Sequence, residues 1–229
     1  MSIRFVALLF PNVTQLDLTG PAQVFSRLPD AELHLAWHRI EPVPTDAGFS
    51  ILPTTTLADA PQADVLFVPG GQGAFELFED ETALGFLRRQ AVDARYVTSV
   101  CTGSFALAAA GLLAGRRATS HWGSLDMLAD LGAVPVAERV VIDGRIVTGA
   151  GVTSGIDFAL TLAAELFDAD TARRAQLALE YDPQPPFDAG SPRRPDADPA
   201  EVERVTAQSR RLRGPLVARA AERLRHPRF

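Results

Sequence analysis

Lysine is absent from this chain of 229 residues, in which all 22 basic residues are arginine. A Schiff base, a pyridoxal phosphate site and a Walker A phosphate loop all require a lysine amine, so the sequence excludes these sites. Cysteine occurs once, at Cys101, which excludes an internal disulfide. No apolar run reaches the roughly 18 residues of a membrane-spanning helix, and the first stretch, "MSIRFVALLFPNV", lacks signal-peptide features. We therefore expect a cytoplasmic protein with no membrane partner.

Charge of the two signs is unevenly spread along the chain. Residues 1–190 carry 12 arginines against 23 acidic residues, whereas residues 191–229 carry 10 arginines against 5 acidic residues. An acidic body argues against nucleic acid as a partner. The basic tail can contact an anion, or it can dock on the acidic body of this chain or of a second copy.

Short apolar runs alternate with helix-like segments through most of the chain. The runs at 4–10, 32–40, 64–71 and 96–100 have strand composition, and helical patterns cover 16–28, 80–92, 103–115, 153–167 and 168–181. Such alternation predicts an α/β fold whose mostly parallel sheet is covered by helices on both faces. Asp143-Gly144, between two apolar runs, predicts a hairpin. In folds of this class the reactive site lies at the carboxyl ends of the strands.

The last part of the chain differs from this pattern. Six prolines in residues 182–199 predict an extended linker. Residues 200–225 have a helical pattern, which Gly214-Pro215 is expected to break. The apolar residues of this helix predict packing on the body or on a second subunit; they are Leu212, Leu216, Val217, Ala220 and Leu224. The predicted organisation is therefore one α/β domain, residues 1–181, followed by a proline-rich arm and C-terminal helix, residues 182–229.

Cys101 lies where a predicted strand meets a predicted helix. The stretch Ser-Val-Cys-Thr-Gly has small residues two before and two after the cysteine, at Ser99 and Gly103. This is the spacing of a nucleophile elbow, in which a strained turn lifts the nucleophile above the sheet and bulky neighbours would collide with it. The following helix is expected to lower the pKa of the thiol. The alternative is a buried structural cysteine, which is common among apolar residues.

A second loop is predicted beside the elbow. Pro69-Gly70-Gly71 closes the preceding buried strand, and glycine there lets backbone N–H groups approach a developing anion. Together the two features favour an active site over a structural cysteine.

These stretches resemble the DJ-1/PfpI superfamily. The resemblance covers roughly residues 3–180 and rests on "DVLFVPGG", "VTSVCTGSFALAAAGLL" and "RRATSHW". Within the superfamily the chain looks most like the isocyanide hydratases, through "ALLFPNVTQLDLTGP" and "GAGVTSGIDFALTLAAELF". The resemblance implies a flavodoxin-like fold, a homodimer and an active-site cysteine at Cys101.

The resemblance also indicates partners for Cys101. The superfamily usually places a glutamate beside the cysteine, whereas isocyanide hydratases carry an aspartate, which matches Asp17 here. Asp17 can instead be a capping residue of its helix. Peptidase-like members have histidine directly after the cysteine; Thr102 occupies that position, which argues against Cys-His peptidase chemistry. We expect His121 to be structural or to act behind the catalytic groups.

The implied reaction is hydration of an isocyanide to an N-formamide. Cys101 would attack the terminal carbon to give a thioimidate, and Asp17 would move the protons. Thr102 and the amides around Gly70 and Gly71 would hold the intermediate, and no cofactor or metal is required. The small residues that we expect to line the substrate crevice are Ala150, Gly151 and Val152.

Two other functions remain open. AraC-type regulators carry a very similar module as a ligand sensor, although only about 30 residues follow the proline-rich segment here, too few for their DNA-binding units. In DJ-1-type proteins the oxidation of the cysteine is itself the event.

Overall fold

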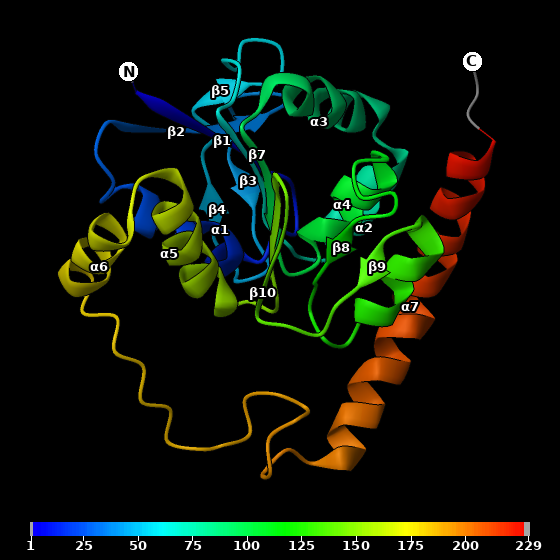
Figure 1. The fold of residues 1–229 in the computed structure, drawn as a ribbon. Coiled ribbons are helices and arrows are strands. Elements are labelled where there is room, and N and C mark those ends of the chain that lie inside the picture. The colour runs from blue at the N-terminus through cyan, green and yellow to red at the C-terminus, as the bar shows by residue number, and fades with distance from the viewer. Residues whose placement is uncertain (1, 227–229) are drawn as a thin grey trace.

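Seven strands form the central sheet of the molecule (Figure 1). In their order across the sheet they are β10 (Val140–Asp143), β11 (Ile146–Gly149), β7 (Tyr96–Val100), β6 (Val65–Val68), β1 (Ile3–Leu8), β2 (Ala31–Trp37) and β5 (Thr55–Thr56). The computed structural model describes residues 2–226. All neighbouring strands are parallel except β10 and β11, which form the hairpin expected at Asp143-Gly144. The prediction of a mostly parallel α/β sheet is confirmed.

Helices cover both faces of the sheet (Figure 1). One face carries α1 (Gln15–Phe25), α5 (Ser154–Leu166) and α6 (Ala169–Ala178). The other carries α2 (Gly73–Glu76), the 3-10 helix η1 (Leu77–Glu79), α3 (Glu81–Asp93), α4 (Gly103–Ala109) and the 3-10 helix η2 (Leu125–Leu131). The central strands β1, β6 and β7 are buried along almost their whole length, as strands covered on both faces must be.

Two small two-stranded sheets lie outside the central sheet. They are β3 (Val43–Pro44) with β4 (Ser50–Ile51), and β8 (Arg117–Ala118) with β9 (Val134–Pro135). An isolated bridge joins Val13 to Thr45, next to the first small sheet, and a second bridge joins Val13 to Gly71. These bridges draw the loops after β1 and β6 together at one edge of the central sheet.

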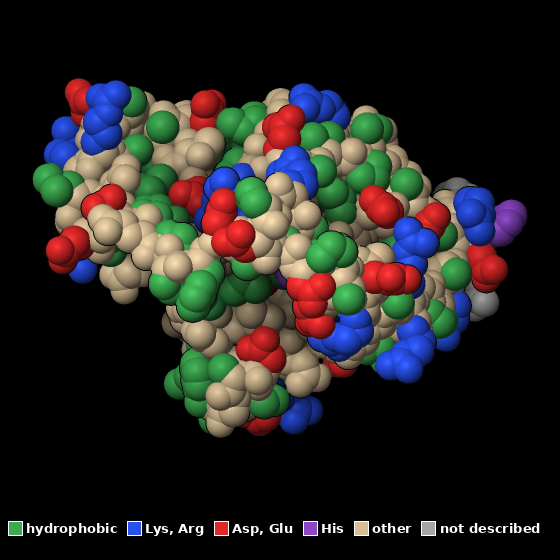
Figure 2. Space-filling view, turned by 90° about the horizontal axis from the view of Figure 1, so that it is seen from below, with side chains coloured by type: hydrophobic (Ala, Val, Ile, Leu, Met, Phe, Trp, Pro, Cys, Tyr) green, Lys and Arg blue, Asp and Glu red, His purple; other side chains and the backbone are tan. Residues whose placement is uncertain are grey.

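The chain reverses its direction of winding between β1 and β6. The connection from β1 to β2 runs through α1 on one face, and the connection from β6 to β7 runs through α3 on the other. Open parallel sheets bind ligands at such a reversal, outside the carboxyl ends of the strands. Seen from below, this end of the molecule is hollowed near its centre (Figure 2).

Helix α7 (Pro199–Arg225) is continuous, so the prediction of a break near Gly214-Pro215 is wrong. Proline at position 215 removes one helical hydrogen bond, but α7 is held against the body on both sides of it. Ser209 is buried before the proline, and Val217, Ala220 and Ala221 are buried after it. The helix packs against η2, α2 and α4 of its own chain, along one side of the molecule in Figure 1.

The basic charge of α7 is matched by acidic groups of the body. Arg223 Nη1 lies 2.7 Å from Glu79 Oε2, and Arg210 Nη2 lies 3.5 Å from Asp126 Oδ2. The sequence allowed the basic tail to dock on the body of its own chain or on that of a second copy, and in the structure it docks on its own chain. Leu212 and Leu224 remain exposed, in contrast to Val217 and Ala220.

Candidate active site

Cys101 occupies a sharp turn between β7 and α4. Its φ is 56°, the left-handed conformation that a non-glycine residue rarely adopts and that costs about 1–3 kcal/mol. Four hydrogen bonds hold the turn: its N–H donates to the carbonyls of Gly149 and Ala150, and its carbonyl accepts from the hydroxyls of Ser104 and Ser120. The elbow predicted from the sequence is therefore present.

Gly103 makes this turn possible. A Cβ atom at position 103 would lie 2.1 Å from the carbonyl oxygen of Val68 and 2.6 Å from that of Pro69. Both carbonyls belong to the adjacent strand β6 and its loop, so a larger residue would push the elbow away from that loop.

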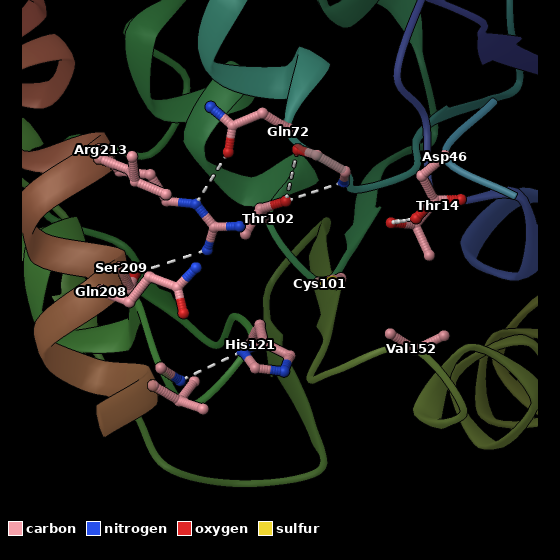
Figure 3. Close-up of a pocket in the computed structure, with 14 residues that line it drawn as sticks. Thr14, Asp46, Gln72, Cys101, Thr102, His121, Val152, Gln208, Ser209 and Arg213 are labelled. Atoms are coloured by element: carbon pink, nitrogen blue, oxygen red, sulfur yellow. Dashed lines mark hydrogen bonds between the residues drawn. The ribbon is translucent and has the colours of Figure 1, made fainter. Parts of the chain in front are cut away.

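A cavity of about 360 Å³ opens above the elbow (Figure 3). One group of lining residues comes from the loops at the carboxyl ends of the strands: Thr14, Asp46, Gly71, Gln72, Cys101, Thr102, His121, Gly123 and Val152. A second group comes from one face of α7: Val205, Gln208, Ser209, Leu212 and Arg213. The C-terminal helix thus forms a wall of the same cavity as the elbow.

Asp17 lies in the first turn of α1, beside Cys101. A Cβ atom at Gly70 would lie 2.6 Å from Asp17 Oδ2 and 2.7 Å from Cys101 Cβ, so both side chains crowd the same glycine. The carboxyl is completely buried, and its Oδ2 accepts a hydrogen bond of 3.1 Å from the amide of Gly70. Its Oδ1 is also buried and has no hydrogen-bond partner among the residues that the structure describes. Asp17 is therefore buried beside Cys101 and does not itself line the cavity, and one of its oxygens has no hydrogen-bond partner among the described residues.

Burial controls the protonation of both groups. It raises the pKa of Asp17 from 3.8 to about 7, against the lowering effect of hydrogen bonds with the Cys101 side chain and the Gly70 amide. Burial also raises the pKa of the Cys101 thiol, and the charge of Asp17 raises it further. The expected lowering of the thiol pKa is wrong in direction, because desolvation outweighs the N-terminus of α4. That helix ends at Ala109 instead of extending to residue 115.

Backbone amides face the sulfur. Hydrogen bonds from the N–H groups of Thr102 and Val152 lower the pKa of Cys101, opposing its burial. The glycine amides that we expected to hold an intermediate have partners of their own. The amide of Gly70 donates to Asp17, and the amide of Gly71 donates to Thr102 Oγ1 over 2.9 Å.

The Thr102 side chain ties the elbow to the neighbouring loop. Its hydroxyl accepts from the Gly71 amide and donates to the Gly71 carbonyl over 3.0 Å. Ala150 lies behind the elbow, where its carbonyl accepts the Cys101 amide. Of the predicted crevice residues, Val152 lines the cavity directly.

His121 lines the cavity beside Gly151. A Cβ atom added at Gly151 would lie 2.8 Å from His121 Cδ2. Its Nδ1 accepts a hydrogen bond of 3.2 Å from the Gly123 amide, which places the proton of the neutral ring on Nε2. Burial lowers the pKa of His121, and the charge of Arg213 lowers it further. We therefore expect a neutral imidazole at the wall of the cavity.

Sequence reasoning missed the cavity residues Asp46, Gln72 and Arg213. Thr14 donates to Asp46 Oδ2 over 2.7 Å, which holds this carboxylate on the wall opposite Arg213 (Figure 3). Nothing in the sequence distinguishes Arg213 from the other nine arginines of residues 191–229. Only the docking of α7 brings it to the site.

The described residues contain no group of three or more His, Cys, Asp or Glu side chains that could hold a metal ion. None of the helices in residues 2–226 has both the length and the apolar character that crossing a bilayer requires.

The chain is similar to known proteins in sequence and in fold. The DJ-1/PfpI family matches residues 3–165 of the chain. The isonitrile hydratase of Pseudomonas putida is 54% identical over 225 residues, which cover 98% of this chain and 99% of that enzyme. The crystal structure of a THiJ/PfpI family protein from Pseudomonas syringae superposes with a TM-score of 0.90 at 41% identity, covering 96% of this chain and 91% of that one.

Part of the chain is also similar in sequence to transcriptional regulators. The HTH-type transcriptional regulator CdhR of Pseudomonas aeruginosa is 33% identical over 195 residues, 80% of this chain and 55% of the regulator.

Proposed function

The chain belongs to the DJ-1/PfpI family, and we propose that it is an enzyme that hydrates isocyanides to N-formamides, with Cys101 as the nucleophile. The observation that carries the proposal is that Cys101 and Asp17 are buried together against Gly70 at the elbow. The likeness to the isonitrile hydratase of Pseudomonas putida, which includes α7, supports it.

The first step adds the thiol across the isocyanide carbon. Cys101 and Asp17 together hold one proton above a pH of about 7, because burial keeps both from ionising at once. The sulfur forms a bond to the terminal carbon of R–N≡C, and the shared proton moves through Asp17 to that same carbon. The product is a thioimidate, S–CH=N–R, and Asp17 is left ionised.

The second step hydrolyses the thioimidate. Ionised Asp17 accepts a proton from water as the oxygen bonds to the thioimidate carbon, and it passes that proton to the nitrogen. The hydroxyl of the resulting S–CH(OH)–NH–R gives its proton to Asp17 as the intermediate collapses to the N-formamide and expels the sulfur, so Cys101 and Asp17 again share one proton. All atoms balance with water as the sole co-reactant.

The backbone supports the sulfur in both steps. The amides of Thr102 and Val152 stabilise its negative charge when it attacks and when it leaves. Thr102 Oγ1 positions Gly71 and thereby the loop that carries Gly70, whose amide orients Asp17.

A second candidate function is ligand sensing, which the similarity to the regulator CdhR favours. The same cavity would then bind a small molecule without converting it. A redox sensor would instead use oxidation of Cys101.

We also propose that the protein acts as a homodimer, as the resemblance of its sequence implies, and that it is located in the cytoplasm. Sedimentation equilibrium tests the dimer, for which the expected mass is twice the 24.6 kDa of one chain. A single species at the monomer mass would contradict it.

A turnover assay separates the candidate functions. An aromatic isocyanide is mixed with the wild-type protein, and formation of the N-formamide is followed by ultraviolet absorbance and confirmed by mass spectrometry. We expect turnover by the wild type and none by Cys101→Ala. Binding without turnover would favour the sensor.

A further inference from the structure

Arg213 is the one residue of α7 whose charge is directed into the cavity in Figure 3. Its Nη1 donates to Ser124 Oγ over 2.7 Å, and its Nε donates to Gln72 Oε1 over 3.3 Å. The guanidinium also stacks on the ring of Phe75, 4.9 Å from the centroid. These contacts fix the plane of the guanidinium and leave Nη2 without a hydrogen bond among residues 2–226.

The partners of Arg213 are all uncharged, in contrast to those of its neighbours. Four other arginines of α7 lie within 4.0 Å of a carboxylate: Arg204, Arg210, Arg219 and Arg223. Those four are exposed, whereas Arg213 is half-buried and forms no ion pair with a described residue. A guanidinium keeps its charge at neutral pH, and burying it without an anion costs free energy.

The free side of Arg213 faces the reactive centre. Figure 3 shows the guanidinium directed toward Thr102 and Cys101, with Gln72 and Ser209 on its other sides. Asp46 occupies the opposite wall beside Thr14. An anionic ligand in this cavity would be attracted to the α7 wall and repelled from the Asp46 wall, which gives it one orientation.

We propose that Arg213 selects isocyanides that carry a carboxylate, by binding the carboxylate while the isocyano carbon faces Cys101. This inference rests on the proposed function and specifies its substrate class. A planar guanidinium with Nη2 free is suited to a carboxylate, because the two groups match in geometry and charge. The cavity of about 360 Å³ accommodates one aromatic ring or a short aliphatic chain between the two points.

The test compares substrates that carry either a charged carboxylate or its uncharged methyl ester. Isocyanoacetate and 4-isocyanobenzoate, a short and a long carboxylate, are each paired with the methyl ester, and kcat/KM is measured for all four. For at least one pair we expect wild-type protein to favour the carboxylate by about 10-fold or more, the range of a charge-assisted hydrogen bond. In Arg213→Gln the ratio of carboxylate to ester should fall by about 10- to 100-fold.

Two variants accompany this measurement. Arg210→Gln removes an exposed arginine from the same helix and should leave the ratio unchanged. Arg213→Lys keeps the charge but loses the planar donor pair, so its ratio should fall between those of the wild type and Arg213→Gln. Because each ratio is taken within one variant, a partial loss of folded protein does not affect it.

Three outcomes would count against the inference. If wild-type protein prefers the ester in both pairs, or shows no preference, Arg213 does not select carboxylates although the hydratase proposal stands. If Arg213→Gln lowers kcat/KM equally for the carboxylate and the ester of a pair, Arg213 supports the sulfur of Cys101 and does not bind the substrate. If none of the four compounds is turned over, the hydratase proposal fails. Calorimetric binding of 4-formamidobenzoate and its methyl ester to Cys101→Ala then decides on Arg213, and equal affinities overturn the inference.

Discussion

Cys101 and Asp17 are two acids that burial prevents from ionising together. Their contact allows one proton to serve both the sulfur and the carboxyl group. The raised pKa of the isolated thiol is therefore compatible with a nucleophile, because Asp17 can hold the proton while the sulfur attacks. The amides of Thr102 and Val152 favour that arrangement.

The pH dependence of turnover should report this pair. Below a pH of about 7 both Asp17 and Cys101 are protonated, so kcat/KM should rise through an apparent pKa of about 7 and then level off. Asp17→Asn should lower kcat/KM by about 10²–10⁴-fold, and the rise of kcat/KM near pH 7 should disappear. Steady-state rates across the pH range provide the measurement. If kcat/KM of Asp17→Asn still rises near pH 7, a group other than Asp17 is responsible for the titration.

Asp17→Glu tests the position of the carboxyl group. The substitution keeps the acid and moves it by one methylene, and a displacement of about 1 Å can cost about 10²-fold in rate. We expect turnover to be impaired but measurable, in contrast to Cys101→Ala, which lacks the nucleophile. Activity equal to that of the wild type would show that the place of the proton donor is not critical.

The same carboxyl should make the folded protein less stable as pH rises. In the unfolded chain Asp17 ionises near its ordinary pKa of 3.8, whereas the folded protein retains the proton up to about 7. The unfolded state therefore releases a proton first, and the cost to the folded state grows between these values to at most about 4 kcal/mol. Replacement by asparagine removes this cost.

Denaturant unfolding of Cys101→Ala and Cys101→Ala/Asp17→Asn measures this effect without the coupled thiol. The double variant should gain stability over the single one, and the gain should be larger at about pH 8 than at about pH 4.5. A gain that does not change with pH would mean that Asp17 is not held protonated by burial.

At the scale of elements, β7, the elbow and α4 act as one unit packed against the loop after β6. The unit tolerates the unfavourable φ of Cys101 because both the N–H and the carbonyl of this residue are held by hydrogen bonds. It tolerates the close approach of the β6 loop because position 103 has no side chain.

Gly103→Ala should therefore lower the free energy of unfolding by about 1–3 kcal/mol or more and reduce turnover, because the new Cβ would overlap the Val68 carbonyl. Gly85→Ala in α3 is the matched control. Its Cβ would meet only the end of the flexible Arg89 side chain at 3.3 Å, and alanine in a helix gains up to about 1 kcal/mol over glycine. Denaturant titration and assay of both variants decide the matter. Equal effects would show that the elbow has room at position 103.

At the scale of the whole molecule, the proline-rich segment carries the chain from α6 across to α7 on the other side of the body (Figure 1). Helix α7 then covers η2 and contributes one wall of the cavity. Its docking is therefore expected to affect both stability and activity.

Two alanines of α7 allow a matched test of this docking. Ala220 is buried against the body, whereas Ala218 is exposed on the same helix. Ala220→Asp places a charge in the interface and should lower the Tm, reduce turnover and make α7 susceptible to cleavage by trypsin at its arginines. Ala218→Asp should leave all three near the wild-type values. If the two variants behave alike, α7 does not need its contact with the body.

Features of this protein that depend on local pattern could be predicted from the amino-acid sequence. Strand β7 lies where its apolar run predicted it, because a strand buried on both faces must be apolar along its length. The elbow followed from the small residues around Cys101, because the strain of that turn permits little else two positions away. Asp17 was found through resemblance, since an acidic residue in a first helical turn is ordinary by pattern alone.

Features that depend on distance and burial could not be predicted, because they arise only when the chain is folded. Desolvation raises the pKa of Cys101, and no sequence pattern shows how far water is excluded. The sequence could not show that the amides of Gly70 and Gly71 donate to Asp17 and Thr102, because these hydrogen bonds depend on how neighbouring loops meet. Helix α7 passes unbroken through Pro215 because contacts with the body hold it on both sides. Arg213 reaches the cavity only through that docking, which joins residues far apart in the chain and leaves no local signal.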